Sequence, residues 1–592
     1  MKDNYYQQSK VTTPLPHREG LGVGLLGLLR IDLLLLLLLF IYSCTPSLPD
    51  HYEEASWQLS PDLFSPNNFG ATLPPNIAPL NFRIMQGDAS KAVTRIHSRK
   101  GGEIIVGGWE VCFKEKAWHR LLDQTRGDTL FCDIYMKAYG QWYHLPTQHF
   151  LIAEEDIDPY ITYRLIRPSY VTYEELTINE RCLENFDERV VYENMRFEDS
   201  DRGQCINCHV PRNWNRDAQS QFHVRQALGG TVFIHGSEVT KVNLKTDSTL
   251  SAGVYPAWHP TQNLIAYSVN ETGQVFHTLD PQKVEVIDYA SDLILYDLDK
   301  NTVQHIDHTA SEFESFPTWS PDGNTLYYIS AHYTPRADDI DADLDTYYDQ
   351  LHYNVYARDF DQQTRRFGPR RLIFDAEAID KSASQPRVSP DGQYLLFTLA
   401  DYGQFHIWHK SAELAIMRLN SPNPSLTPDP SPNGEESDYL SGENAADKVY
   451  TPISIRRGVG GEAGVGTEAI GADSYHSWSS NGRWILFSSR RDDGNYTHLY
   501  ISYFDKDGRT HKPFRLPQRS PDSDDLLLRS YNAAEFSLQP VRPSQRQLRK
   551  AIKADARPAT YAGSALAHPE ADSIAARPPR PDADRRGEAV GY

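Results

Sequence analysis

The 592-residue sequence predicts an all-β protein, in which a β-rich N-terminal domain is followed by a ring of repeated sheets. Residues 81–165 alternate short apolar and polar bursts between turns, the pattern of half-buried strands. From about residue 230 to 540 a turn followed by an apolar strand recurs, and such repeats close into a β-propeller because no repeat can bury its faces alone. The expected order is leader 1–44, N-terminal domain 45–200, connecting segment 201–229, propeller 230–540 and tail 541–592.

The leader has the composition of an export signal. A basic stretch ending at Arg30 precedes the apolar run 33–40, which is too short for the roughly 20 residues of a membrane-spanning helix. Residues 41–44, Ile-Tyr-Ser-Cys, resemble a bacterial lipoprotein box, in which the cysteine takes a lipid and becomes the mature N-terminus. The resemblance implies lipidation of Cys44 and anchoring at a membrane surface, with simple secretion as the alternative.

The N-terminal domain contains strand-like runs at 103–107, 130–135 and 161–166. We expect these strands to form a sandwich-like fold, since each must bury one face against a second layer. Residues 173–185 have helical spacing and are expected to lead toward the connecting segment.

The connecting segment contains the sequence Cys-Ile-Asn-Cys-His at residues 205–209. Two thiols at this spacing close onto the vinyl groups of a haem, while the adjacent imidazole reaches the iron. The sequence therefore predicts one covalent haem c held by Cys205 and Cys208, with His209 as the proximal iron ligand. Because the β-pattern resumes at residue 230, we expect a short haem-binding loop covered by the neighbouring domains, with Trp214 and Phe222 packed on the haem.

The sixth iron position has several candidates. His223 is the leading one, because it lies within loop reach of the motif between apolar residues. Met195, which precedes Cys205 by ten residues, and His235 are the alternatives, and an open or water-bound iron is another. A histidine pair would lower the reduction potential relative to a thioether ligand.

Two other metal interpretations are less favoured. Cys205 and Cys208 have zinc-finger spacing, but the chain has no second C-x-x-C to complete a tetrahedral site. Alternating aspartates suggest a calcium loop, yet they lack the glycine and glutamate of an EF-hand and fit a solvated acidic loop better. These residues are Asp339, Asp341, Asp343 and Asp345.

The remaining cysteines give two open alternatives. Cys112 and Cys132 both lie in short β-like runs, so one disulfide between them is expected on one interpretation. On the other, Cys112, Cys132 and Cys182 are three buried free thiols.

Four turn motifs define the repeats of the second half, and each precedes an apolar strand. They begin at Pro256 (Pro-Ala-Trp-His-Pro), Pro317 (Pro-Thr-Trp-Ser-Pro-Asp-Gly), Pro386 (Pro-Arg-Val-Ser-Pro-Asp-Gly) and Ser477 (Ser-Trp-Ser-Ser-Asn-Gly). The pattern resembles the repeats of TolB-type propellers, and we expect six blades. The Pro-, Gly- and Ser-rich segment 421–472 and the tail 541–592 lack an apolar period and are expected to be disordered.

Charge and missing motifs exclude several functions. The formal net charge of -20, with 79 acidic and 59 basic residues, argues against nucleic acid or anionic lipid as a partner. No G-x-S-x-G and no Gly-rich phosphate loop is present, and there is a single C-x-x-C-H. The sequence therefore favours an electron carrier or a binding protein over a catalyst.

Taken in order, these features resemble a group of uncharacterised TolB-like propeller lipoproteins of Gram-negative bacteria with one c-type haem motif. The resemblance covers most of residues 75–540 and implies no established activity. We expect a monohaem c-type cytochrome of the periplasm or cell envelope, lipid-anchored, with the outer membrane favoured, which transfers electrons to redox or envelope proteins and uses the propeller as a docking platform. The alternative is a propeller scaffold or binding lipoprotein of the envelope, whose haem is structural or sensory.

Overall fold

The computed structural model describes residues 46–56, 59–167, 175–194, 204–277, 282, 284–309, 311–334, 336, 340–419, 451–452 and 472–567. The leader with Cys44, the alternative iron ligand Met195 and most of segment 421–472 lie outside the described residues. None of the helices in these ranges has the length and apolar character needed to span a membrane. The chain is all-β, as predicted.

The N-terminal unit is built on a mixed seven-stranded sheet. A three-stranded sheet packs on the same apolar core, which includes Phe64, Phe82 and Val111. The large sheet contains β1 (Glu53–Glu54), β3 (Thr72–Leu73), β5 (Lys91–Ser98), β6 (Glu103–Gly107), β8 (Thr129–Ala138), β9 (Gln141–His144) and β10 (Gln148–Ile152). The small sheet contains β2 (Phe64–Ser65), β4 (Phe82–Ile84) and β7 (Glu110–Val111), and η1 (Pro61–Leu63) precedes β2.

Helix α2 (Glu115–Thr125) is an element that the alternating pattern did not predict. Its buried residues Trp118, Leu121 and Leu122 recur at helical spacing and join the core of the large sheet. The helix contacts β5, β6 and β8. The N-terminal unit is therefore β-rich with one covering helix, and its sandwich-like character stays a prediction.

The strands from β11 to β34 form units of four antiparallel strands, each running from an inner to an outer strand. One parallel bridge, between Ser291 and Phe313, joins the third and fourth units into a single nine-stranded sheet that also includes a C-terminal strand. The first unit has β34 (Ser530–Ser537) as its inner strand, followed by β11 (Tyr160–Ile166), β12 (Thr177–Cys182) and β13 (Glu188–Glu193). The second unit consists of β14 (Gln204–Pro211), β15 (Gln219–Gln226), β16 (Gly230–His235) and β17 (Glu238–Asn243). The third consists of β18 (Val254–Trp258), β19 (Leu264–Phe276), β20 (Val284–Asp297) and β21 (Thr302–Asp307).

The remaining units follow in chain order. They are β22 (Glu312–Trp319), β23 (Thr325–His332), β24 (Asn354–Asp361), β25 (Arg366–Phe374); β26 (Ser382–Val388), β27 (Tyr394–Ala400), β28 (Glu413–Arg418), β29 (Thr451–Pro452); and β30 (Ser474–Trp478), β31 (Trp484–Ser489), β32 (His498–Tyr503), β33 (Phe514–Arg515). Short helices in the connections are η3 (Arg212–Asn215), α3 (Ile340–Tyr347), η4 (Tyr348–Gln350), η5 (Glu377–Ile379), η6 (His406–Trp408) and α4 (Ser523–Leu527).

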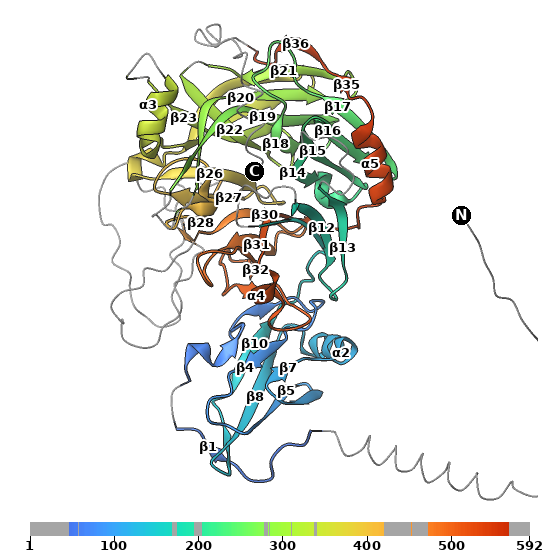
Figure 1. The fold of residues 1–592 in the computed structure, drawn as a ribbon, viewed down its shortest axis with the longest axis vertical. Helices are drawn as coiled ribbons and strands as arrows, with labels where there is room; N and C mark the ends of the chain where they lie inside the picture. The colour runs from blue at the N-terminus through green and yellow to red at the C-terminus, as the bar shows by residue number, and fades with distance from the viewer. Residues whose placement is uncertain are drawn as a thin grey trace, which may run out of the picture.

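The inner strands make the units into a closed ring. Each contacts the next in the order β34, β14, β18, β22, β26, β30, and β30 contacts β34 again. Closure depends on β34, because this late strand pairs antiparallel with β11, which stands more than 350 residues earlier in the chain. Figure 1 shows the N-terminal unit below this ring, next to β31, β32 and α4.

Two predicted boundaries are wrong. The ring begins at β11, not at residue 230, and residues 204–226 form β14 and β15 instead of a loop between two domains. Residues 177–182 form β12, so the helix expected over 173–185 is also wrong. β15, with the sequence Gln-Ser-Gln-Phe-His-Val-Arg-Gln, is buried from Ser220 to Val224. Because three of these five buried residues are polar, the strand shows no alternation of apolar and polar residues in the sequence.

The tail predicted to be disordered has ordered structure over residues 541–567, and residues 568–592 lie outside the described residues. It contains α5 (Gln545–Lys553), β35 (Arg557–Pro558) and β36 (Thr560–Ser564). β35 pairs with β17, β36 pairs with β21, and Leu566 bridges to Phe367 of β25, so this segment runs along the outer edges of three successive units (Figure 1). We call residues 545–567 the C-terminal strap. Outer strands have unpaired backbone groups, and the strap satisfies some of them.

The N-terminal unit and the ring share one apolar core. Trp484, Leu486 and Phe514 belong to the same buried cluster as Trp118 and Phe150. The Trp484 indole N–H also donates a hydrogen bond of 3.1 Å to the Asp156 carbonyl. This shared core fixes the N-terminal unit against the last units of the ring.

Candidate functional site

The Cys-Ile-Asn-Cys-His sequence lies on β14, the inner strand of its unit. β14 pairs with β15, where Cys205 is opposite Arg225 and Ile206 is opposite Val224. Ile206 and Val224 pack in the apolar cluster shared with β12 and β13. Because side chains alternate along a strand, Cys205 lies on the other face, where it is fully buried.

A β-bulge interrupts β14 at Cys208, which has a φ of 52°. The other inner strands have the same irregularity with a positive-φ residue at the matching position. We call these residues the axial ring: Cys208, Tyr255, Phe316, Gln385, Tyr475 and Ala533.

The members of the axial ring contact one another around the centre of the propeller-like ring. The Tyr255 and Phe316 rings stack with centroids 4.0 Å apart, and the Tyr475 backbone N–H donates a 2.8 Å hydrogen bond to Gln385 Oε1. Burial raises the pKa of the Cys208 thiol, while the Tyr255 backbone and the positive Arg225 and Arg164 oppose this rise. Cys208 is thus a neutral thiol among aromatic and cationic neighbours.

His209 is buried, with 6% of its surface exposed. Among the described residues, no hydrogen bond of good geometry reaches Nδ1 or Nε2 of its imidazole, and the Thr162 backbone lies beside the ring. Burial lowers its pKa to about 4; the backbone of Thr162 opposes this shift and Arg164 adds to it. The imidazole is therefore neutral at pH 7, which is the form that binds a metal ion.

The structure separates His209 from the predicted sixth ligand. His223 is directly opposite Asn207, on the face that also contains Cys205. Beyond the bulge Val210 returns to that face opposite Gln221, so His209 lies on the other face, beside Thr162 of β11. The His223 imidazole Nδ1 is 3.3 Å from Thr231 Oγ1, and burial, followed by Arg225, lowers its pKa to about 3.

The other candidates for this position do not replace His223. His235 ends β16 and is exposed, and Met195 lies outside the described residues. Trp214, expected on the haem, donates its indole N–H to the Trp478 carbonyl at 2.7 Å, and Phe222 packs in the cluster shared with β12 and β13.

The donor set fits the chemistry of a c-type haem, since it offers two thiols and a neutral imidazole without hydrogen bonds. The backbone arrangement fits less well. In the strand, Cys205 and His209 project from opposite faces, so attachment of both sulfurs with coordination by His209 requires a turn in place of the strand at 205–208.

The less favoured metal interpretations have these outcomes. Among the described residues Cys205, Cys208 and His209 do not gather into a metal-binding group, which disfavours zinc at the motif. Three of the four aspartates lie in α3, where Asp343 accepts a hydrogen bond from the Tyr333 hydroxyl and Asp345 accepts one of 2.5 Å from Tyr289, while Asp339 lies outside the described residues. Calcium there stays a prediction.

The predicted disulfide is wrong. Cys112 is an exposed thiol just beyond β7, and Cys132 is a buried thiol in β8. The alternative of three buried thiols is only partly right, because Cys182 is buried and Cys112 is not.

Sequence reasoning missed a second polar group, Asp292, His305 and His308, on the third unit. The spacing His-x-x-His at 305–308 was a usable signal, but its aspartate partner is brought close only by the pairing of β20 with β21. The axial ring was equally hidden, since its members share a structural position and no residue type.

No protein-family model and no curated protein matches the chain. Solved structures similar to it include an ACO/RPE65 chimera, with a TM-score of 0.33, 10% identity and coverage of 82% of this chain and 97% of that one. A prolyl endopeptidase matches at a TM-score of 0.30 and 12% identity, over 61% of this chain and 42% of that one. An oligogalacturonate lyase in complex with manganese matches at 0.26 and 12%, over 77% and 99%. The latter two are propeller-type folds.

Proposed function

We propose that this protein is a monohaem c-type cytochrome of the cell envelope, lipid-anchored through Cys44, with Cys205 and Cys208 as the attachment sites and His209 as an axial iron ligand. The observation that carries the proposal is the buried, neutral His209, one residue from a C-x-x-C thiol, whose ring nitrogens have no hydrogen bond of good geometry within the described part of the chain. A buried polar group without a partner costs free energy, so its retention points to a ligand. When bound, the haem supplies one-electron redox chemistry.

The residues around the motif would tune such a group. Arg164 and Arg225 bring positive charge to the surroundings of Cys208, which favours the reduced state because it opposes the charge gained on oxidation. Tyr255 and Tyr475 of the axial ring limit the access of water with their half-buried aromatic side chains. Together these residues keep water away from the motif and place positive charge near it.

We further infer that the four-stranded units form a TolB-like propeller of six blades, closed by β34, which serves as a platform for a redox partner. The succession of contacts between the inner strands supports this inference. The turn motifs at Pro317 and Pro386 support the TolB-like repeat.

Maturation of the full chain in a host that attaches haem c tests the proposal. We expect an intact mass increased by one haem and a c-type pyridine haemochrome, both lost in the Cys205→Ala, Cys208→Ala double variant. His209→Ala should keep any attached haem and change its spin state. His476→Ala is the matched control, because His476 follows Tyr475 on β30 as His209 follows Cys208 on β14, and it is also buried. An unchanged mass, or equal spectra for His209→Ala and the parent, contradicts the proposal.

A second candidate function is a scaffold in the cell envelope. The observation that favours it is the arrangement of Cys205 and His209 on opposite faces of a strand that is already buried in a closed ring. For a pure scaffold, the Cys205→Ala, Cys208→Ala variant should fold, reach the membrane and retain its partners. Loss of partner binding in that variant opposes the scaffold and supports a role for the haem.

A further inference from the structure

Three side chains that the proposed haem chemistry does not use gather on the third unit. Asp292 comes from β20, His305 from β21, and His308 follows directly after β21. One ligand atom from each lies within 4.8 Å of the others. Asp292 and His305 are buried and His308 is half-buried. A single metal ion can be shared at these distances once the two imidazoles, which stack in parallel, turn their lone pairs toward a common point.

Neighbouring contacts fix the side chains of this group. The His308 Nδ1 and Asp292 Oδ2 are 2.8 Å apart, and the His305 and His308 rings stack in parallel with centroids separated by 4.1 Å. The Nδ1 of His305 lies 3.0 Å from the Tyr561 hydroxyl. His305 is only 5% exposed, and its Nε2 has no hydrogen-bond partner among the residues that the structure describes. A buried nitrogen of this kind, within a group of metal-binding side chains, indicates a missing ligand.

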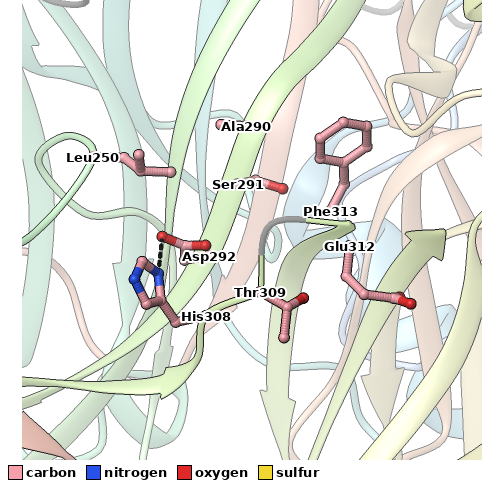
Figure 2. Close-up of a pocket in the computed structure, with 8 residues that line it drawn as sticks. All are labelled: Leu250, Ala290, Ser291, Asp292, His308, Thr309, Glu312 and Phe313. Carbon is pink, nitrogen blue, oxygen red and sulfur yellow. Dashed lines mark hydrogen bonds and ion pairs between the residues drawn. The ribbon is translucent and has the colours of Figure 1, made fainter. Parts of the chain in front are cut away.

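A small hollow gives access to the group (Figure 2). It holds about 270 Å³ of empty space, its open mouth included. Asp292 and His308 line it together with Leu250, Ala290, Ser291, Thr309, Glu312 and Phe313. Figure 2 shows the Asp292 carboxylate bonded to His308 on one side of the hollow and the Glu312 carboxylate on the other.

Negative charge is concentrated around the hollow. Glu314 is fully buried, and its pKa is raised by burial and then by the carboxylates of Asp307, Asp292 and Glu312. Arg358 is paired with Asp307 at 2.7 Å, and Arg370 with Glu312 at 3.0 Å, so two cations offset part of this charge. A further cation in the hollow would offset more of it.

We propose that Asp292, His305 and His308 bind a divalent first-row transition metal ion, with Zn²⁺ as the representative. Two imidazoles and one carboxylate form a ligand set that such ions prefer over Ca²⁺ or Mg²⁺, whose ligands are oxygens. Three protein ligands leave a coordination position open toward the hollow. This inference does not depend on the proposed haem.

The C-terminal strap takes part in the site. Tyr561 lies on β36, which pairs with β21, and its hydroxyl contacts His305 Nδ1. A hydrogen bond to the second nitrogen of a ligating histidine fixes the ring and its tautomer. Tyr561 is therefore a positioning residue, and Tyr561→Phe should weaken metal affinity on the order of ten-fold.

Calorimetric titration of the chelator-treated full chain with Zn²⁺ tests the proposal. We expect one ion per chain, and at least a hundred-fold loss of affinity in His308→Gln and Asp292→Asn. His498→Gln is the matched control, because His498 also pairs with an aspartate, Asp492, at 2.7 Å but belongs to no group of three among the described residues. Circular dichroism of each variant verifies folding, and His308→Gln, whose side chain is 18% exposed, is the variant least prone to unfold.

X-ray absorption at the zinc edge identifies the ligands in the same sample. Two imidazoles and an oxygen at about 2.0–2.2 Å are expected. Sulfur ligands at about 2.3 Å would assign the ion to Cys205 and Cys208 and overturn the proposal. Equal affinity of His308→Gln and the parent, or no saturable binding at all, would overturn it as well.

Discussion

Three histidines buried in this ring are held in the neutral state by the exclusion of water. Burial lowers the pKa of His209 to about 4 and those of His223 and His476 to about 3. Each imidazole therefore keeps a lone pair at neutral pH and gains no charge until the solution is strongly acidic. The residues can act as ligands or hydrogen-bond partners, and they do not act as physiological pH switches.

Asp288 is the opposite case, a buried acid that titrates near neutrality. Burial raises its pKa to about 7, although Asn270 at 3.1 Å and Tyr353 at 3.3 Å donate hydrogen bonds that lower it. Between pH 4 and pH 7 the unfolded chain loses this proton while the folded chain keeps it, so rising pH favours unfolding. The contribution is at most about 4 kcal/mol, at about 1.4 kcal/mol per pKa unit.

We expect Asp288→Asn to flatten the fall in stability across this range. The free energy of unfolding in urea, measured at pH 5 and pH 8, should decrease more for the parent protein than for the variant. Other acids contribute equally to both proteins, so the difference isolates Asp288. Parallel pH profiles for the two would show that the carboxyl is ionised in the folded state.

For single residues, the sequence identifies the members of the site but not the face of the strand from which each side chain projects. Simple alternation would put Cys205, Asn207 and His209 on one face of a strand. The bulge at Cys208 inserts one extra residue and moves His209 to the other face. The sequence Cys-Ile-Asn-Cys-His does not predict a bulge, because the other inner strands have the same bulge with residues as different as Tyr255 and Ala533 at its position.

Among the elements, the Pro-Asp-Gly turns are those that the sequence predicts most directly. Gly323 and Gly392 both adopt a φ of 72°, which favours glycine, at the turn between an inner strand and its partner. Their surroundings differ: a Cβ on Gly323 would meet the His259 ring, whereas on Gly392 the nearest atom is in Pro321, 3.6 Å away. The two glycines thus form a matched pair.

We expect Gly323→Ala to destabilise the protein more than Gly392→Ala. Backbone strain costs each variant about 1–2 kcal/mol, and the clash with His259 adds roughly 1–3 kcal/mol to the first. Urea unfolding of both variants measures the difference. Equal losses would mean that the His259 side chain moves aside at no cost.

Apart from α2, whose apolar residues do recur at helical spacing, the elements that sequence reasoning missed have little apolar periodicity. The strands of residues 264–269, 325–330 and 484–489 contain buried apolar runs that predicted them well. β15 is polar, and β35 and β36 bury few large side chains, so their order comes from pairing with distant edges. Such tertiary pairing leaves no local signal.

At the scale of the whole molecule, the C-terminal strap is expected to contribute to global stability. A chain ending at residue 543 loses the buried Leu548, Ile552 and Leu566, each worth roughly 1.5–3 kcal/mol of burial. It also loses the 2.7 Å hydrogen bond from Asn301 Nδ2 to the Pro558 carbonyl. Thermal and urea unfolding should both show a large decrease in stability.

The matched control is a chain ending at residue 567, which keeps every one of these contacts. It should unfold at the same temperature and the same urea concentration as the full-length protein. If the chain ending at 543 is as stable as this control, the strap rests on the ring without stabilising it.

The pairing of β34 with β11 also dictates an order of events during biosynthesis. Ribosomes make the chain from its N-terminus, so the strand at 160–166 must wait for residues 530–537 before its sheet is complete. Until then the ring is not closed, and Cys205, which lies on β14 next to the position of β34, has not yet acquired its final burial. Any enzyme that modifies this thiol must act before β34 pairs with β11, so the rate of ring closure competes with the rate of modification.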